Sequence, residues 1–142
     1  MCGSSSSSPS KDKKKVGGKK LNVLIVDNDG MSQTAYILCL QKCGVETLGV
    51  RNEKVAVKIH DITQMRFDLI LMSFVMPDMD GIQATKKFRS MEITTMIVGM
   101  TNLDENEEYC KEFMEAGLDE CYEKPLTMKI FQSLVEKIFN KI

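Results

Sequence analysis

The chain has 142 residues, of which 43% are hydrophobic and 27% are charged, and its formal net charge is −1 at pH 7. A chain of this length can form one domain with a sizeable core and a tail. It has no apolar run near the length of a membrane span, and residues 1–20 carry serine and lysine where a secretory signal needs an apolar stretch. We therefore expect a soluble protein of the cytoplasm, the nucleus or both, with no membrane partner.

The charge is distributed unevenly along the chain. Residues 1–20 contain six lysines and one aspartate and carry +5, whereas residues 21–142 carry −6. An acidic body argues against nucleic acid as a partner, because a short basic tail alone gives weak, salt-sensitive attraction. Residues 1–20 also hold too little apolar surface to offset the entropy of ordering them, which predicts a disordered Ser/Lys-rich tail before a domain at 21–142.

The cysteines form an odd set with no CxxC spacing: Cys2, Cys39, Cys43, Cys110 and Cys121. This pattern is typical of reduced thiols and not of a disulfide framework or a zinc site. Cys39 and Cys43 stand one helical turn apart, but the chain has one histidine, so we favour helix packing over a shared metal.

From Leu21 onward, short apolar runs alternate with helix-like patterns. The predicted elements, in chain order, are a strand over 21–26, a helix over 31–43, a strand over 45–50, a helix capped by Asn52, a strand over 67–72, a helix after Gly81, a strand over 96–100, a helix over 104–116, a strand over 120–123 and a final helix capped by Thr127. Five strands alternating with five helices predict an α/β fold, a doubly wound parallel sheet.

Four of these helices show apolar residues at helical spacing. In chain order the apolar sets of the first, second and fifth helices are Met31, Ala35 and Leu38; Val55, Ile59 and Ile62; and Phe131, Leu134, Val135 and Ile138. In the third helix Ile82, Thr85 and Phe88 are aligned on one face. Gly44 and Gly117 can end the first and fourth helices, and the fourth has an acidic first turn at Asp104, Glu105 and Glu107 that suits the helix dipole.

The carboxyl ends of the strands are the expected place for a site, because ligands of open parallel sheets bind there near the switch point. Polar residues follow four of the five strands: Asp27 and Asn28 after the first, Ser73 at the end of the third, Thr101 after the fourth and Lys124 with Pro125 after the fifth. These side chains are predicted to converge on one crevice.

Four segments at these strand ends resemble motifs of the receiver domains (CheY-like) of two-component and phosphorelay response regulators. The segment DLILMSFVMPDMDG at 68–81 is similar to the motif in which an aspartate closes the third strand, shortly before Met-Pro and Met-Asp-Gly. The other three are VDND at 26–29, GMT at 99–101 and YEKP at 122–125. The resemblance covers 21–142 and implies a flavodoxin-like, five-stranded sheet in the order 2-1-3-4-5. A receiver with a short tail is also similar to the small standalone receivers of plant phosphorelays.

The resemblance also implies roles for individual positions. In the family, two acids after strand one and the aspartate at the end of strand three bind Mg²⁺, and a lysine neutralises the phosphoryl oxygens. A threonine hydroxyl turns toward the new phosphate, and an aromatic residue on strand five moves inward with it, which shifts the domain between two states. The positions that match are Ser73 for the phosphoacceptor, Asp27 and Asn28 for the acidic pair, Thr101 for the switch hydroxyl, Lys124 for the phosphate-binding lysine, Pro125 for a cis proline and Cys121 for the switch aromatic.

The chain departs from the family at Ser73, Asn28 and Cys121. A serine hydroxyl needs a base to become a nucleophile, and a neutral amide replaces one metal-binding charge. Mg²⁺ binding is therefore expected to be weak or lost, with vestigial ligands at Asp27, Asn28 and the carbonyl of Val75, and no cofactor is expected. Two interpretations of Lys124 stay open: it pairs with Asp27 in a pocket that no longer binds phosphate, or it still binds phosphate. Ser73 is interpreted as a buried polar residue and not as a kinase substrate.

We therefore hypothesise a pseudo-receiver, a non-enzymatic module that binds a histidine-containing phosphotransfer protein or a sensor kinase as a scaffold or decoy, as a monomer or weak dimer. By resemblance, the docking residues are Met31, Ser32, Ala35, Pro125 and Leu126. The alternative is a conventional receiver that drains phosphate from a phosphorelay, which holds if Ser73 is an engineered replacement of aspartate. A third alternative is a receiver cut from a larger regulator.

Overall fold

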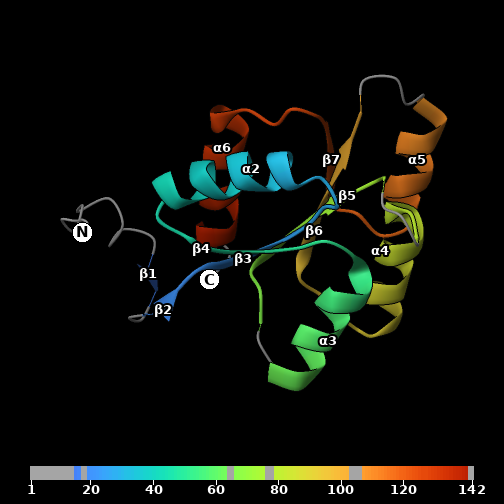
Figure 1. Ribbon diagram of the computed structural model, residues 1–142, viewed down its shortest axis with the longest axis horizontal. Coiled ribbons are helices and arrows are strands. Elements are labelled where there is room, and N and C mark those ends of the chain that lie inside the picture. Colours follow the sequence, from blue (N-terminus) through green and yellow to red (C-terminus); the bar gives the residue numbers. More distant parts are fainter. Residues whose placement is uncertain (1–14, 17–18, 64–65, 76–78, 103–106, 141–142) are drawn as a thin grey trace.

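A computed structural model describes residues 15–16, 19–63, 66–75, 79–102 and 107–140. At its centre is a five-stranded parallel sheet with the order β4-β3-β5-β6-β7, which confirms the predicted order 2-1-3-4-5 (Figure 1). The strands are β3 (Asn22–Val26), β4 (Glu46–Val50), β5 (Leu69–Ser73), β6 (Met96–Thr101) and β7 (Glu120–Glu123). In this register Ser73 lies beside Met100, and Thr101 beside Glu123. The carboxyl ends of β5, β6 and β7 therefore form one edge.

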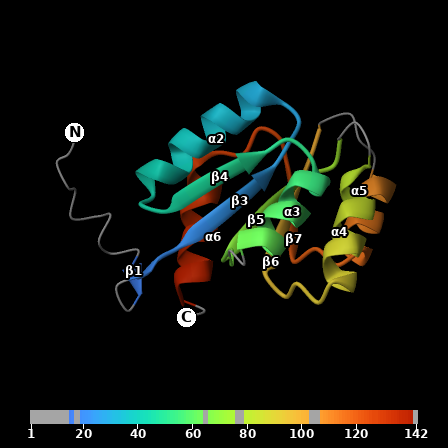
Figure 2. The same ribbon diagram turned by 60° about the horizontal axis from the view of Figure 1, so that its bottom comes forward.

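Helices cover both faces of the sheet (Figures 1 and 2). One face carries α2 (Gly30–Lys42) and α6 (Met128–Asn140), and the other carries α3 (Glu53–Thr63), α4 (Gly81–Ser90) and α5 (Glu107–Glu115). Strand side chains alternate between the two faces of a sheet. Val23 and Ile25 of β3 therefore lie in the core under α2 and α6, and Leu24 and Val26 lie in the core under α3, α4 and α5. The result is a three-layer α/β domain.

Polar side chains fix the starts of four helices. The caps predicted from the sequence are confirmed at α3 and α6, where Val55 N donates to Asn52 Oδ1 at 3.0 Å and Ile130 N donates to Thr127 Oγ1 at 3.3 Å. Asp29 and Asp80 accept in the same way at the starts of α2 and α4. After α2, Gly44 has a φ of 81°, a left-handed conformation that glycine adopts without steric cost.

The apolar stripe predicted for α2 is wrong about which face is buried. Met31 is 85% exposed and Leu38 is 55% exposed, and Ala35 is exposed with them. The buried face instead carries Tyr36 and Leu40. The physical reason is a contact with α6: the ring centroids of Phe131 and Tyr36 lie 5.3 Å apart. This aromatic contact favours burial of the Tyr36 side of α2 against the sheet.

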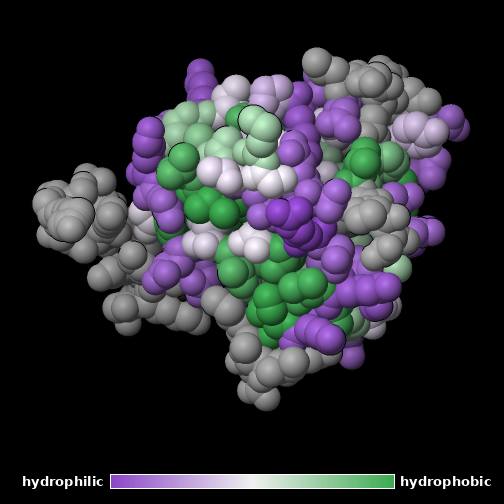
Figure 3. Space-filling model, in the orientation of Figure 1, coloured by the Kyte–Doolittle hydropathy of each residue, from purple (hydrophilic) through white to green (hydrophobic). Residues whose placement is uncertain are grey.

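The stripe predicted for α3 is also wrong at Val55, which is 40% exposed, whereas Ala56 is buried. The surface view shows apolar side chains gathered over α3 (Figure 3). The side chain of Ile62 lies outside the described residues. The predicted inward faces of α4 and α6 are confirmed, because Ile82, Thr85, Phe88, Phe131, Leu134, Val135 and Ile138 are all buried.

Part of the N-terminal segment forms a short antiparallel pair, β1 (Lys15–Val16) with β2 (Lys19–Lys20). The rest of 1–20 lies outside the described residues, so tail disorder stays a prediction. The described part of α5 begins at Glu107, and the first turn predicted at 104–106 falls in an undescribed segment. Among the described helices, none is long and apolar enough to cross a membrane.

Candidate functional site

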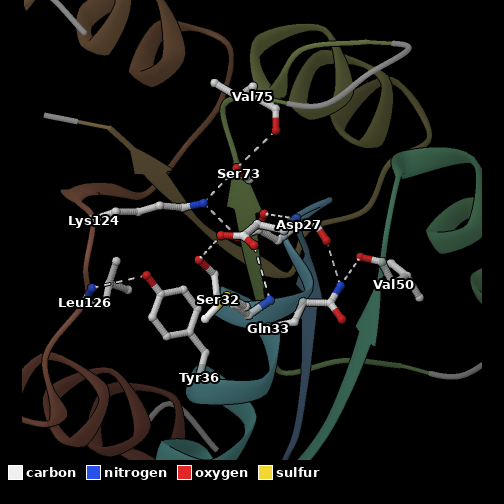
Figure 4. A network of polar contacts seen from close by, with 11 residues as sticks. Asp27, Ser32, Gln33, Tyr36, Val50, Ser73, Val75, Lys124 and Leu126 are labelled. Carbon is white, nitrogen blue, oxygen red and sulfur yellow. Dashed lines mark hydrogen bonds and ion pairs between the residues drawn. The ribbon is translucent and has the colours of Figure 1, made fainter. Parts of the chain in front are cut away.

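An ion pair lies where the strand ends meet (Figure 4). Lys124, which follows β7, donates from Nζ to Asp27 Oδ2 at 2.8 Å and to Ser73 Oγ at 3.3 Å. The side chain of Asp27 is 1% exposed and that of Lys124 is 14% exposed. The structure therefore brings together three predicted residues from the ends of three different strands.

Backbone contacts fix Asp27 in place independently of any ligand. Its backbone N donates to Val50 O at 3.0 Å, and its Oδ1 accepts from Asp29 N at 2.9 Å. Gln33, in the first turns of α2, donates from Nε2 to the carbonyls of Asp27 at 2.8 Å and Val50 at 2.6 Å (Figure 4). Gln33 thus ties α2 to the ends of β3 and β4, a role that sequence reasoning missed because no local pattern marks it.

Ser73 occupies the end of β5 and is 1% exposed. Its hydroxyl accepts from Lys124 and donates to the carbonyl of Val75 at 3.4 Å, so both of its contacts are long. The start of α4 packs tightly against this point, because a Cβ built on Gly81 would lie 2.4 Å from Ser73 O. Ser73 is therefore enclosed by the fold but weakly held through its hydroxyl.

Thr101 closes the site on the β6 side. It is 3% exposed, its carbonyl accepts from Lys124 N at 2.6 Å, and Cys110 Sγ approaches its hydroxyl at 4.0 Å. Beside it, Phe74 packs at 5.5 Å from the ring of Tyr109 and 5.7 Å from that of Phe113. The residue directly after Ser73 thus joins an aromatic cluster with α5.

The three positions after β3 have different fates. Asn28 is exposed, and Asp29 caps α2 by accepting from Met31 N and from the hydroxyl of Ser32. The hydrogen bond from Ser32 holds the pKa of Asp29 below its ordinary value. Asp29 therefore caps the start of α2, and Asp27 supplies the carboxylate to the crevice.

The crevice fits a hard divalent cation poorly. Asp27 already faces the Lys124 ammonium, and the Val75 carbonyl faces the Ser73 hydroxyl. Within the described ranges, no group of three or more His, Cys, Asp or Glu side chains could hold a metal ion. Mg²⁺ prefers several oxygen ligands with net negative charge, and an internal ammonium beside Asp27 opposes its approach.

At β7 the peptide bond between Lys124 and Pro125 is cis, the geometry that the resemblance implied. Cys121 packs with the core under α3, α4 and α5, whereas Tyr122 packs with the core under α2 and α6, so the two face opposite sides of the strand. Tyr122 donates its hydroxyl to Glu120, and this hydrogen bond raises the pKa of Tyr122. The position that resembles the switch aromatic therefore carries a thiol. The described cysteines, Cys39, Cys43, Cys110 and Cys121, are not disulfide-bonded.

The predicted docking residues differ in exposure. Met31, Ala35 and Pro125 are exposed, and Ser32 is half-buried beside Asp29. Leu126 is 6% exposed and packs in the core, so its side chain is not available to a partner, and its backbone N donates to Tyr36 Oη at 3.4 Å. Of the predicted docking residues, Met31, Ala35 and Pro125 are therefore the ones with exposed side chains.

Comparisons with known proteins agree with this geometry. The model of the response regulator receiver domain matches residues 23–136. Two similar proteins of Arabidopsis thaliana are two-component response regulator ARR22, 42% identical over 86% of each chain, and two-component response regulator 24, 43% identical over 84% of each chain. In fold the chain is similar to a two-component response regulator of Clostridium difficile (TM-score 0.76, 24% identity, covering 86% of this chain and 98% of that one). It is also similar to chemotaxis protein CheY4 of Vibrio cholerae (TM-score 0.74, 21% identity, covering 84% and 98%).

Proposed function

The chain belongs to the response regulator receiver domain family, and from that premise we propose that it is a pseudo-receiver, which binds phosphotransfer partners without accepting phosphate on an aspartate. The observation that carries the proposal is Ser73 at the end of β5, 3.3 Å from Lys124 Nζ. This place matches the phosphoacceptor aspartate of the family, and a hydroxyl stands there in place of a carboxylate.

The surroundings of Ser73 do not make it a substitute nucleophile. Serine acts as a nucleophile when a neighbouring base takes its proton. The nearest described groups are the Lys124 ammonium, which donates to Asp27, and the Val75 carbonyl, which is a poor base. Asp27 directs its oxygens to Lys124 and to Asp29 N. No general base therefore faces the Ser73 hydroxyl among the described side chains.

The same arrangement supports weak Mg²⁺ binding. One carboxylate, that of Asp27, remains at the three family positions for metal-binding acids, and Lys124 balances its charge. Adding millimolar Mg²⁺ should leave the melting temperature of the native protein unchanged, because a ligand stabilises the fold only when its free concentration approaches or exceeds its Kd. In the variant that carries both Asn28→Asp and Ser73→Asp, Mg²⁺ should raise the melting temperature.

The partner that fits this proposal is a histidine-containing phosphotransfer protein or a sensor kinase. Receiver domains of two-component systems interact with proteins of these kinds, and the start of α2 offers an exposed apolar side chain at Met31 for such a contact. A receiver that binds without taking phosphate competes with phosphate-accepting receivers, so it acts as a scaffold or decoy.

The test mixes the purified protein with a phosphorylated histidine phosphotransfer protein and Mg²⁺ and follows phosphate on both chains by intact mass. We expect phosphate to stay on the donor with the native chain and to move to the variant with Asn28→Asp and Ser73→Asp. Transfer to the native chain, or loss of donor phosphate through it, would refute the proposal and favour a working phosphate-draining receiver.

Binding is tested separately by calorimetry with the unphosphorylated partner. Met31→Glu should weaken binding, whereas Val55→Glu, a matched change at an exposed residue of α3 on the opposite face, should not. Failure of the native chain to bind any of a panel of phosphotransfer proteins would reject the decoy role while leaving the loss of phosphate acceptance intact.

A further inference from the structure

Two cysteines lie near Thr101 on one face of the sheet. Cys110, in α5, places its Sγ 4.0 Å from the hydroxyl oxygen of Thr101. Cys121, in β7, packs with the core under α3, α4 and α5. Thr101 faces the same side, because it follows Met100, which packs in the core under α2 and α6, and strand side chains alternate. Two thiols and a hydroxyl therefore share one face of the strands β6 and β7.

The packing of α5 brings these two cysteines toward each other. Cys121 pairs in register with Gly99, two residues before Thr101 on β6. Phe113, one turn after Cys110, lies against the same glycine, because a Cβ built on Gly99 would be 2.8 Å from Phe113 Cε2. With strands about 4.8 Å apart and a rise of about 3.3 Å per residue, the Cα atoms of Cys121 and Thr101 lie about 8 Å apart. The helix α5 therefore covers the residues of β6 that neighbour Cys121, and it also contacts β7 (Figures 1 and 2).

Both cysteines are accessible to a small oxidant. Each is half-buried, and neither is disulfide-bonded in the structure. The other two cysteines that the structure describes lie on α2 and pack with the core on the opposite face of the sheet: Cys43 is 8% exposed and Cys39 is half-buried. Among the described cysteines, Cys110 and Cys121 are therefore the pair in which both thiols are half-buried and share one face.

We propose that Cys110 and Cys121 are a reversible redox site, at which hydrogen peroxide converts the two thiols to a disulfide. The first thiol attacks a peroxide oxygen, the O–O bond breaks, and a sulfenic acid forms as one water leaves. The second thiol attacks the sulfenic sulfur, the S–S bond forms, and a second water leaves. The two thiols thus lose two electrons and two protons, and one hydrogen peroxide is reduced to two waters. A dithiol reductant reverses the reaction by thiol–disulfide exchange.

The bond has a conformational consequence near Thr101. A disulfide requires the Cα atoms of its two cysteines to lie within about 7 Å of each other. Its formation therefore holds α5 against β7 and fixes the helix beside Thr101. Cys121 occupies the position that resembles the switch aromatic, so the bond gives the domain an input that requires neither an acceptor aspartate nor Mg²⁺. The site depends on thiols alone and holds or fails independently of the role of Ser73.

Peroxide treatment of the fully reduced chain, followed by alkylation of the remaining thiols, tests the proposal by mass spectrometry. We expect two fewer alkylated thiols per chain after treatment, and dithiothreitol added before alkylation should restore both. Trypsin cleaves after Lys111 and so separates the two cysteines. The disulfide should therefore link the peptide that ends at Lys111 to the peptide that contains Cys121. Hydrogen exchange of the α5 amides should slow in the oxidised form, because the bond restrains local opening of the helix.

Single substitutions identify the pair. Cys110→Ser and Cys121→Ser should each abolish the linked peptide, and dimedone should trap a sulfenic acid on the remaining thiol in one of the two variants. Cys39→Ser, a matched change at the half-buried cysteine of α2, should leave the linked peptide intact, and circular dichroism checks that every variant folds. A native chain that keeps all its thiols under excess peroxide would overturn the proposal. So would a linked peptide that joins other cysteines, or a cross-link between two chains that disappears on dilution. A disulfide that leaves the exchange of α5 unchanged would overturn its conformational consequence.

Discussion

Replacing Lys124 by methionine removes the cation from the crevice while keeping most of the side chain's length. The ammonium is 2.8 Å from Asp27 Oδ2, and the carboxylate is 1% exposed, so the change leaves a buried charge with one remaining hydrogen bond, from Asp29 N. Removing one partner of a buried ion pair costs about 3–5 kcal/mol. Because Lys124 is itself 14% exposed, we expect the lower end, about 3 kcal/mol, with a fall in melting temperature of about 10 °C.

Urea unfolding at pH 7 measures the free energy of unfolding of the native chain and of Lys124→Met. The combination with Asp27→Asn should recover at least half of the loss, because it removes the uncompensated charge, and the double-mutant cycle isolates the coupling. Lys129→Met, at an exposed residue of α6, is the control and should stay within about 0.5 kcal/mol of the native chain. A loss below about 1 kcal/mol for Lys124→Met would refute the view that this pair stabilises the fold.

Three further predictions concern other parts of the structure. Arg89→Met should lower the free energy of unfolding by about 2–3 kcal/mol in urea, because the guanidinium donates to three backbone carbonyls and to Asp119. Gly81→Ala should lower the melting temperature, since its Cβ would lie 2.4 Å from a backbone oxygen, whereas Gly30→Ala, with its nearest neighbour at 3.6 Å, should be neutral or slightly stabilising. Hydrogen bonds from Lys137, the largest cause, and from Tyr122 hold the pKa of Glu120 below its ordinary value of 4.5. The stabilising contribution of ionised Glu120 is therefore present above pH 4.5 and is lost as pH falls through the pKa in the folded state. Chemical unfolding should therefore show Glu120→Gln less stable than the native chain at pH 7, with the difference shrinking below pH 4.5.

The strands and their ends were predictable because short apolar runs and the polar residues after them are local signals. The helix faces were less so, because α2 has apolar residues on more than one side and the sequence does not say which side meets the sheet. Tyr36 is buried and Met31 is not, since α6 supplies Phe131 as a partner from far along the chain. Contacts between distant segments therefore decide what helical periodicity leaves open.

The candidate site shows the same division. Asp27, Ser73, Thr101 and Lys124 were predicted to converge from their positions after strands, and the structure brings them together. Gln33 was missed, because a glutamine that bonds two carbonyls on different strands leaves no mark in local sequence. Arg89 was missed for the same reason, since the groups it bonds belong to loops whose approach depends on the finished fold.

Asp27 and Lys124, which match the family motifs, make short contacts that stabilise the fold. Asn28 and Ser73, which depart from the motifs, make few or long contacts in the structure. Asp27 accepts from Asp29 N, and its ion pair with Lys124 joins the end of β3 to the end of β7. Asn28 is exposed, and Ser73 makes two long hydrogen bonds, so changes at these positions leave the sheet and its helices in place. On the proposed function, we therefore expect the loss of acceptor chemistry to cost little stability, because the ion pair between Asp27 and Lys124 remains. If the ion pair is structural in this way, introducing aspartate at Ser73 places a second buried carboxylate beside Lys124. That variant should then be less stable without Mg²⁺ and should regain stability with it.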